Sequence, residues 1–150
     1  MGTRNLEQLI TEIFEELELL IPTYKSNPED WQISEGNVAV CIITEQGKVF
    51  GKLYGSDKLR QRSFFKIAWH KASQVWITGQ KTGVYEQMVF SGKVDPEAYS
   101  PIELPDLIGW VGGQPIAIDN ETQLSIGFSG FRGFNDIAIV QKAIDLVLKK

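Results

Sequence analysis

Residues 38–44 constrain the fold of this 150-residue chain more than any other segment. Every position in the run Val-Ala-Val-Cys-Ile-Ile-Thr is apolar or β-branched, and no charged residue interrupts it. Such a run is typical of a strand that is covered on both faces. The turn residues 45–48 and the segment 49–54 then predict a returning strand, so this part of the chain is expected to form a hairpin within a sheet.

An amphipathic helix is predicted ahead of this hairpin. Apolar side chains recur every three or four residues between Leu6 and Ile21, which makes one apolar stripe. Asn5 suits the N-cap position, and Pro22 is expected to end the helix. Residues 23–36 are polar and rich in turn-forming residues, which predicts a loop before the first strand.

A basic helix is predicted after the hairpin. Asp57 is placed to cap it, its interior runs over about residues 59–77, and its cations, Lys71 among them, are expected to lie largely off the buried face. Residues 82–93 suit a short helix slightly better than a strand. Three prolines make residues 95–106 irregular.

The last third of the chain predicts a second hairpin and a final helix. Residues 115–118 and 123–129 read as its strands, and Asn135 or Asp136 is expected to cap the helix. Strands are thus joined by hairpins rather than alternating strictly with helices. This order favours a single α+β domain, residues 1–150, with an antiparallel sheet packed by helices.

The net charge of −4 hides an uneven distribution along the chain. Residues 1–47 carry two basic and nine acidic side chains, residues 48–81 carry eight basic and one acidic, and residues 82–150 carry five and nine. The basic segment can be neutralised by the acidic N-terminal helix or by a partner subunit, or it can receive an anionic small molecule. A pI near 5.0 and the absence of a binding motif argue against nucleic acid as the partner.

Few side chains are available for metal or nucleophilic chemistry. His70 is the only histidine and Cys41 the only cysteine, which excludes an internal disulfide, a CxxC motif and a metal site built on several histidines. Cys41 lies within the buried strand, where an inert thiol is expected. No motif points to a reaction, so whether the chain is an enzyme stays open.

The N-terminus and the hydropathy predict a cytoplasmic protein. The first residues lack the basic start and continuous apolar stretch of a signal peptide. No run of about 18 uncharged apolar residues is present, so no membrane span is expected.

One glycine-rich segment, residues 127–133, leaves a predicted strand and enters the final helix. Its backbone N–H groups, together with Ser129 and Arg132, could hold an anion at the helix N-terminus. The alternative is that these glycines only let the strand turn tightly into the helix.

The chain resembles the GlcG/HbpS-like family, which includes haem-degrading domains and the C-terminal domain of PduO-type proteins. The residues that carry the resemblance are Gly112-Gly-Gln-Pro-Ile116, Ser125-Ile-Gly-Phe-Ser-Gly130 and Asp136 before an apolar helix, with Lys71-Ala72 upstream. The resemblance implies a profilin-like three-layer α/β/α sandwich with a five-stranded antiparallel sheet, and a homo-oligomer. It also implies that haem, or another tetrapyrrole such as a corrinoid, can be the ligand.

The resemblance gives the basic helix a role, because tetrapyrrole propionates are anionic. We therefore expect a ligand site without a protein-bound metal centre, formed by Lys66, His70, Lys71, Gly112, Gly113, Ser129, Gly130 and Arg132. The alternative function is a non-enzymatic assembly module, without a cofactor, whose basic helix docks on an acidic surface.

Overall fold

The computed structural model describes residues 5–93 and 107–149, and its centre is a four-stranded sheet. All neighbouring strands run antiparallel, in the order β2-β1-β4-β3. This confirms the predicted α+β class and antiparallel sheet. The strands are β1 (Val38–Thr44), β2 (Val49–Tyr54), β3 (Gly113–Ala117) and β4 (Gln123–Ser129).

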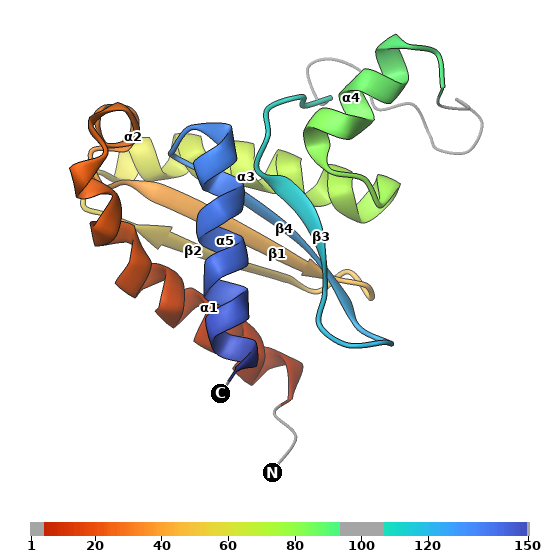
Figure 1. The fold of residues 1–150 in the computed structure, drawn as a ribbon, viewed down its shortest axis with the longest axis horizontal. Helices are drawn as coiled ribbons and strands as arrows, with labels where there is room; N and C mark the ends of the chain where they lie inside the picture. The colour runs from red at the N-terminus through yellow and green to blue at the C-terminus, as the bar shows by residue number, and fades with distance from the viewer. Residues whose placement is uncertain (1–4, 94–106, 150) are drawn as a thin grey trace.

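Helices cover both faces of the sheet, which makes three layers (Figure 1). α1 (Leu6–Leu20) and α5 (Gly133–Leu148) lie on one face, and α3 (Lys58–Thr78) lies on the other. The short helix α4 (Thr82–Phe90) follows α3 at the β3 edge, where a short helix was predicted. No helix in the described ranges is long and apolar enough to cross a membrane.

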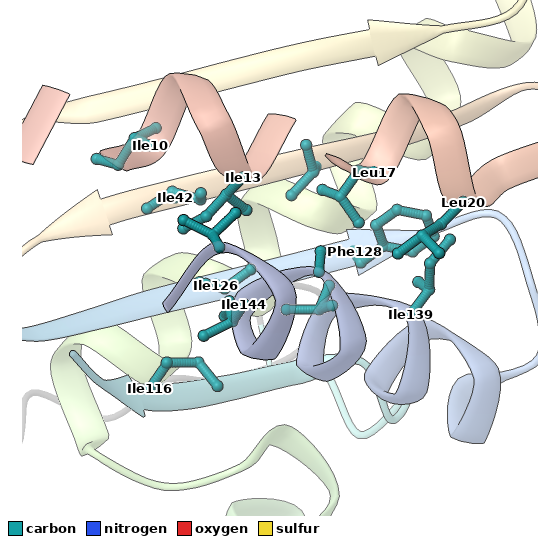
Figure 2. Close-up of a cluster of buried hydrophobic side chains, with 14 of the residues drawn as sticks. Ile10, Ile13, Leu17, Leu20, Ile42, Ile116, Ile126, Phe128, Ile139 and Ile144 are labelled. Carbon is teal, nitrogen blue, oxygen red and sulfur yellow. The ribbon is translucent and has the colours of Figure 1, made fainter. Parts of the chain in front are cut away.

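The sequence of β1 explains why it lies at the centre of these layers. All seven of its residues are buried, as the uninterrupted apolar run predicted. Val38, Val40 and Ile42 face α1 and α5, where they join the large core shown in Figure 2. The residues between them belong to a second cluster against α3.

The interface between α3 and the sheet is built from small residues. Ala39 of β1 packs against Ala68 and Ala72 of α3. Gly127 of β4 lies so close to α3 that a Cβ atom there would be 2.2 Å from the carbonyl oxygen of Ala68. Cys41 belongs to the same layer, and burial raises the pKa of its thiol to about 12, which makes it the inert thiol that was expected.

The five-stranded sheet implied by the family resemblance was wrong for the described residues, because these form four strands. Pro115 gives a physical reason at the β3 edge. It pairs with Ser125 between the hydrogen-bonded positions of the ladder, so its nitrogen faces the outer side of β3. Proline has no N–H to donate there, which makes this edge a poor template for another strand.

Two local predictions were also wrong. Residues 23–36 are not a plain loop, because Ile21–Ser26 form a 3-10 helix and Pro28–Ser34 form α2, with Asn27 as its N-cap. The last helix begins at Gly133, ahead of the predicted caps. Asp136 instead lies inside the first turn and accepts the Phe131 N–H at 2.9 Å. The prediction for residues 95–106 lies outside the described residues.

Candidate functional site: an apolar cleft over a buried ion pair

A cleft of about 580 Å³ opens between α3, the segment that precedes β3, and the turn that joins β4 to α5. Its walls are mainly apolar and aromatic, and Trp110 and Phe134 remain 66% and 60% exposed. A volume of roughly 300–1,000 Å³ is typical of sites for small molecules. The lining residues are Ile33, Phe64, Ile67, Lys71, Gly109, Trp110, Val111, Ser129, Gly130, Phe131, Gly133, Phe134 and Asp136.

Two buried polar side chains hold the segment whose residues Gly109, Trp110 and Val111 form one wall of the cleft. The Gln74 amide donates to the carbonyl of Ile108 and accepts its N–H, both at 2.8 Å. The Thr82 hydroxyl donates to the Trp110 carbonyl at 2.7 Å and accepts the Gly113 N–H at 3.3 Å. These bonds fix the segment against α3 and α4 as a strand partner would. The backbone that carries Trp110 is therefore fixed.

The floor of the cleft is an ion pair between α3 and α5. Lys71 Nζ lies 3.3 Å from Asp136 Oδ2 and donates to the Phe128 carbonyl at 2.9 Å. Both side chains are almost fully buried. Gly112 makes the arrangement possible, since a Cβ atom at this position would lie 2.5 Å from Lys71 Nζ.

Burial controls the charge of this pair. It raises the pKa of Asp136 to about 7, and the nearby Lys71 and the Phe131 N–H only partly oppose that shift. Burial likewise lowers the pKa of Lys71, against the opposing effect of Asp136. Burial thus makes Asp136 easier to protonate and Lys71 easier to deprotonate than the same groups in water.

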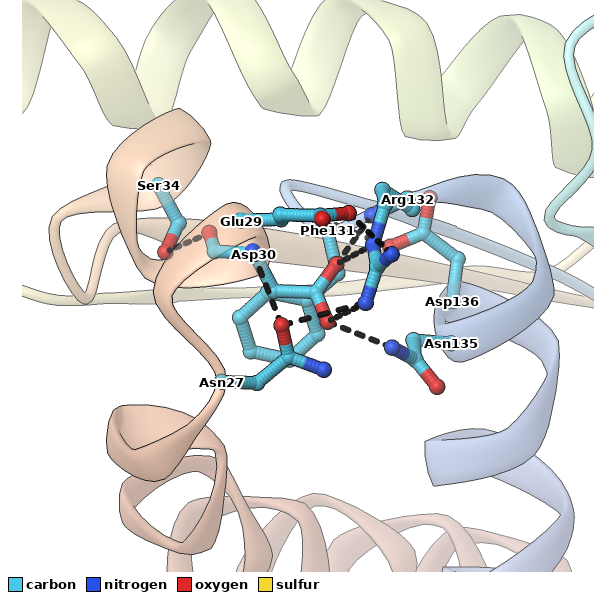
Figure 3. A network of polar contacts seen from close by, with 8 residues as sticks. All are labelled: Asn27, Glu29, Asp30, Ser34, Phe131, Arg132, Asn135 and Asp136. Atoms are coloured by element: carbon cyan, nitrogen blue, oxygen red, sulfur yellow. Dashed lines mark hydrogen bonds and ion pairs between the residues drawn. The ribbon is translucent and has the colours of Figure 1, made fainter.

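A second polar network fixes the turn before α5 (Figure 3). The carboxylate of Asp30 is fully buried and accepts the Arg132 backbone N–H at 2.7 Å and its Nε at 3.1 Å. Asn135 donates to the same carboxylate, and Arg132 also pairs with Glu29. Burial alone would raise the pKa of Asp30, but the hydrogen bonds from Arg132 and Asn135 outweigh it and hold the pKa below its usual value.

The contacts of this turn bear on whether the glycine-rich segment, residues 127–133, holds an anion or only lets the strand turn tightly into the helix. Two of its backbone donors are already engaged by the chain's own carboxylates, the Phe131 N–H by Asp136 and the Arg132 N–H by Asp30. Gly130 has a φ of +142°, and a Cβ atom there would lie 2.4 Å from a methyl carbon of Val38. The glycine serves the tight passage from β4 to α5.

The structure brings together only part of the predicted ligand site. Lys71, Ser129 and Gly130 line the cleft, and Gly112 and Gly113 pack directly behind Lys71. Arg132 is committed to Asp30 and Glu29 and does not line it.

Helix geometry explains why the other two predicted residues are elsewhere. Phe64, Ile67 and Lys71 share one face of α3 and line the cleft. His70 lies about 100° around the helix from Lys71, and Lys66 about 140°, so neither can reach the same space. The prediction that Lys71 lies off the buried face was wrong, because it is only 2% exposed.

Sequence reasoning missed the residues that shape the cleft. Asp136 was considered as a helix cap and as part of the family resemblance, while Gln74, Thr82 and Trp110 were not among the predicted site residues. Two signals were present: Gln74 lies three residues after Lys71 on the buried side of α3, and Trp110 lies two residues before the Gly112-Gly113 pair. Neither signal says where its partner lies in space.

The basic segment is only partly neutralised by acids among the described residues. Of its eight cations, Lys48 pairs with Glu7, Arg60 with Glu35 and Lys71 with Asp136 among the described residues. α1 lies across the sheet from α3, so its acids cannot cover the outer face of the basic helix. Lys52, Lys58, Arg62, Lys66 and Lys81 are exposed. Within residues 5–93 and 107–149, no group of three or more His, Cys, Asp or Glu side chains could hold a metal ion.

The fold and the cleft define a three-layer α+β domain with an aromatic-walled pocket over a buried lysine–aspartate pair. No protein-family model matches the sequence, and no curated protein matches it either. Solved structures do match, and they bear out the resemblance stated above at the level of the fold.

HbpS is 13% identical, with 97% of this chain and 92% of that chain covered and a TM-score of 0.59. The Klebsiella pneumoniae protein ORFY, described as a DUF336 protein, is 16% identical, with 98% and 96% covered and a TM-score of 0.63. PduOC, solved as a haem complex, is 18% identical, with 96% and 94% covered and a TM-score of 0.59. The chain has the same fold as these proteins over nearly its whole length.

Proposed function

We propose that the protein binds an apolar, ring-containing small molecule in the cleft, and that a tetrapyrrole is the first candidate. The observation that carries the proposal is the open cleft itself, with exposed Trp110 and Phe134 at its mouth and polar groups confined to its floor. Large apolar side chains left in water around a concave site are typical of ligand-binding surfaces. The haem complex of PduOC, which shares the fold, supports the choice of ligand class.

The described lining residues fit the ring of a tetrapyrrole better than its iron. Aromatic and aliphatic side chains can stack on a flat macrocycle. None of the described lining residues is a histidine, cysteine, methionine or tyrosine, the side chains that ligate haem iron. The single lysine there already bonds to Asp136 and Phe128. We therefore assign no iron ligand and no step at the metal.

The expected result is that metal-free protoporphyrin binds about as tightly as haem. Titrating each into the purified protein and following the Soret band gives the two affinities. Ile67→Trp should weaken both by about tenfold or more, because the larger side chain fills the cleft from α3. Ile77→Trp makes the same change on an exposed position of the same helix and should leave both affinities unchanged.

Two outcomes would contradict this proposal. Equal affinity in the Ile67→Trp and Ile77→Trp proteins would place any tetrapyrrole outside the cleft. Saturable binding of haem without binding of protoporphyrin would require an iron ligand and would overturn the proposal that ring contacts suffice.

A second function, assembly through the basic helix, is favoured by a different surface. β2 lies at the sheet edge, and its α3 side is only partly covered: Val49 and Leu53 are 47% and 45% exposed. Phe65 of α3 lies against Gly51 of this strand. One turn further along the helix Trp69 is 40% exposed, and Arg62 and Lys66 are exposed on the neighbouring stripe. We call this apolar and cationic surface the β2–α3 face.

The partner that suits the β2–α3 face is a second copy of this chain. The outer side of α1 carries Glu15 and Glu18 beside Leu19, which is 70% exposed, so it offers acids and an apolar side chain together. This face of α1 is complementary in charge and apolar character to the β2–α3 face. Contact between the two faces would explain the charge asymmetry of the sequence.

If copies assemble in this way, salt should dissociate the oligomer, because 1 M salt shortens the screening length to about 3 Å. Light scattering at increasing salt measures the change. Arg62→Glu/Lys66→Glu should give a monomer in low salt, and adding Glu15→Lys/Glu18→Lys in the same chain should restore assembly. Lys142→Glu, at an exposed position of α5, is the control for the change of charge alone. A salt-resistant oligomer, or a wild-type monomer in low salt, would refute this contact.

A further inference from the structure

Lys71 is the one amine among the described residues that line the cleft. Its Nζ donates one hydrogen bond to the Phe128 carbonyl and one to Asp136. These two bonds hold the nitrogen in a single position at the cleft floor. Around it stand apolar side chains such as Phe64 and Ile67. A lysine desolvated in this way keeps its lone pair at lower pH than an exposed one, which is the condition for attack on a carbonyl carbon.

Asp136 is placed to serve that chemistry. Its Oδ2 lies 3.3 Å from Lys71 Nζ, so a molecule that bonds to the nitrogen would present its oxygen near the same carboxyl. Burial favours the protonated form of Asp136, and only a protonated carboxyl can donate to a carbonyl or hydroxyl oxygen. The Phe131 N–H fixes the other carboxyl oxygen at 2.9 Å. One oxygen is therefore held while the other faces the amine.

We propose that Lys71 is a carbonyl-reactive amine that forms an imine with an aldehyde or ketone carried by an apolar ring in the cleft. The inference rests on the proposed cleft but names a different reaction and a different class of ligand. The walls select the ring, and the floor carries the reaction. Nothing in the arrangement requires a metal or a cofactor.

The step balances without an oxidant or a reductant. The Nζ lone pair forms the N–C bond, the carbonyl oxygen takes a proton from Asp136, and the carboxylate removes a proton from the nitrogen, which leaves a carbinolamine. Asp136 then protonates the hydroxyl, the C–O bond breaks, and water leaves as the C=N bond forms. The product is a protonated imine paired with the Asp136 carboxylate. Apolar walls slow its hydrolysis by limiting access of water.

Reductive trapping tests the proposal with a defined probe. The full-length protein is incubated with 2-naphthaldehyde and cyanoborohydride at about pH 6, where an ordinary exposed lysine is protonated. Peptide mass spectrometry then locates the added group. The Lys71 peptide should be labelled at least about tenfold faster than the peptide carrying Lys58, an exposed lysine of the same helix. Lys71→Met should abolish the fast label, and Lys58→Met should not.

A second titration separates failure of this reaction from failure of the cleft. 2-Naphthalenemethanol has the same ring and no carbonyl, so it can bind but cannot form an imine. If the alcohol binds and Ile67→Trp weakens its binding, yet Lys71 is labelled no faster than Lys58, the imine proposal is overturned and the cleft remains a ligand site. If the alcohol does not bind and no label forms, both proposals fall. Fast label that persists in Lys71→Met would also overturn the assignment.

Discussion

Asp136→Ala is expected to lower the free energy of unfolding by about 3–5 kcal/mol, because it leaves the buried Lys71 amine without its carboxylate. The same change removes the acceptor of the buried Phe131 N–H. Urea denaturation measures the loss. Asp145→Ala, an exposed aspartate on the same helix, is the matched control and should change stability by no more than about 0.5 kcal/mol.

A double variant separates the effect of losing the ion pair from the effect of losing side-chain volume. Lys71→Met/Asp136→Leu replaces both charges with apolar groups, and such replacements are often close to neutral. It should therefore be more stable than the sum of the two single changes predicts, with a coupling of about 1–3 kcal/mol. Additive losses would show that the two residues do not act as a pair. A loss in Asp136→Ala no larger than in Asp145→Ala would show the same.

The pH dependence of stability gives a second readout of this pair. Burial raises the pKa of Asp136 to about 7, so the folded protein keeps a proton that the unfolded chain releases above about pH 4. This carboxyl therefore makes the free energy of unfolding fall as the pH rises from about 4 to about 7. Lys71, whose pKa is lowered, has the opposite effect at higher pH. Asp136→Asn cannot ionise and should remove the fall; a fall that persists belongs to another group.

Gly127→Ala is expected to destabilise the fold by about 2–3 kcal/mol, through overpacking between β4 and α3. The new methyl would lie 2.2 Å from the Ala68 carbonyl oxygen and 2.7 Å from the Ala72 nitrogen. Both are backbone atoms, so no neighbouring side chain can turn aside to relieve the clash. α3 must move away from the sheet, and this carries Lys71 out of its place at the cleft floor.

Urea denaturation measures the loss of stability in Gly127→Ala, and protoporphyrin titration measures the effect on ligand binding in the cleft. Gly83→Ala, in α4, is the control, because its new methyl meets a Val111 methyl carbon only at 3.3 Å. We expect it to change stability by less than about 1 kcal/mol. Equal stability of the two variants would mean that α3 does not pack on β4 as closely as the structure shows. A large loss in Gly127→Ala with unchanged ligand affinity would separate the cleft from this interface.

The candidate site was only partly predictable, and Lys71 and Asp136 show why. Both were singled out, Lys71 as a ligand-site cation of the basic helix and Asp136 as a helix cap. They are 65 residues apart in the chain, and their pairing depends on α3 and α5 meeting at the end of β4. Helical spacing grouped Lys71 with Lys66 and His70, yet rotation about the helix axis separates these side chains in space.

Local pattern alone determined the doubly covered strand β1, the hairpins, most of the helices and the antiparallel sheet, because each depends on side chains a few residues apart. Tertiary structure decided the number of strands, the pairing of Arg132 with Asp30, and the cleft. These depend on distant segments that meet: Asp30 reaches Arg132 across 102 positions, and Gln74 holds Ile108 across 34. A buried polar group must find a partner wherever the fold supplies one, and the chain order does not record where that is.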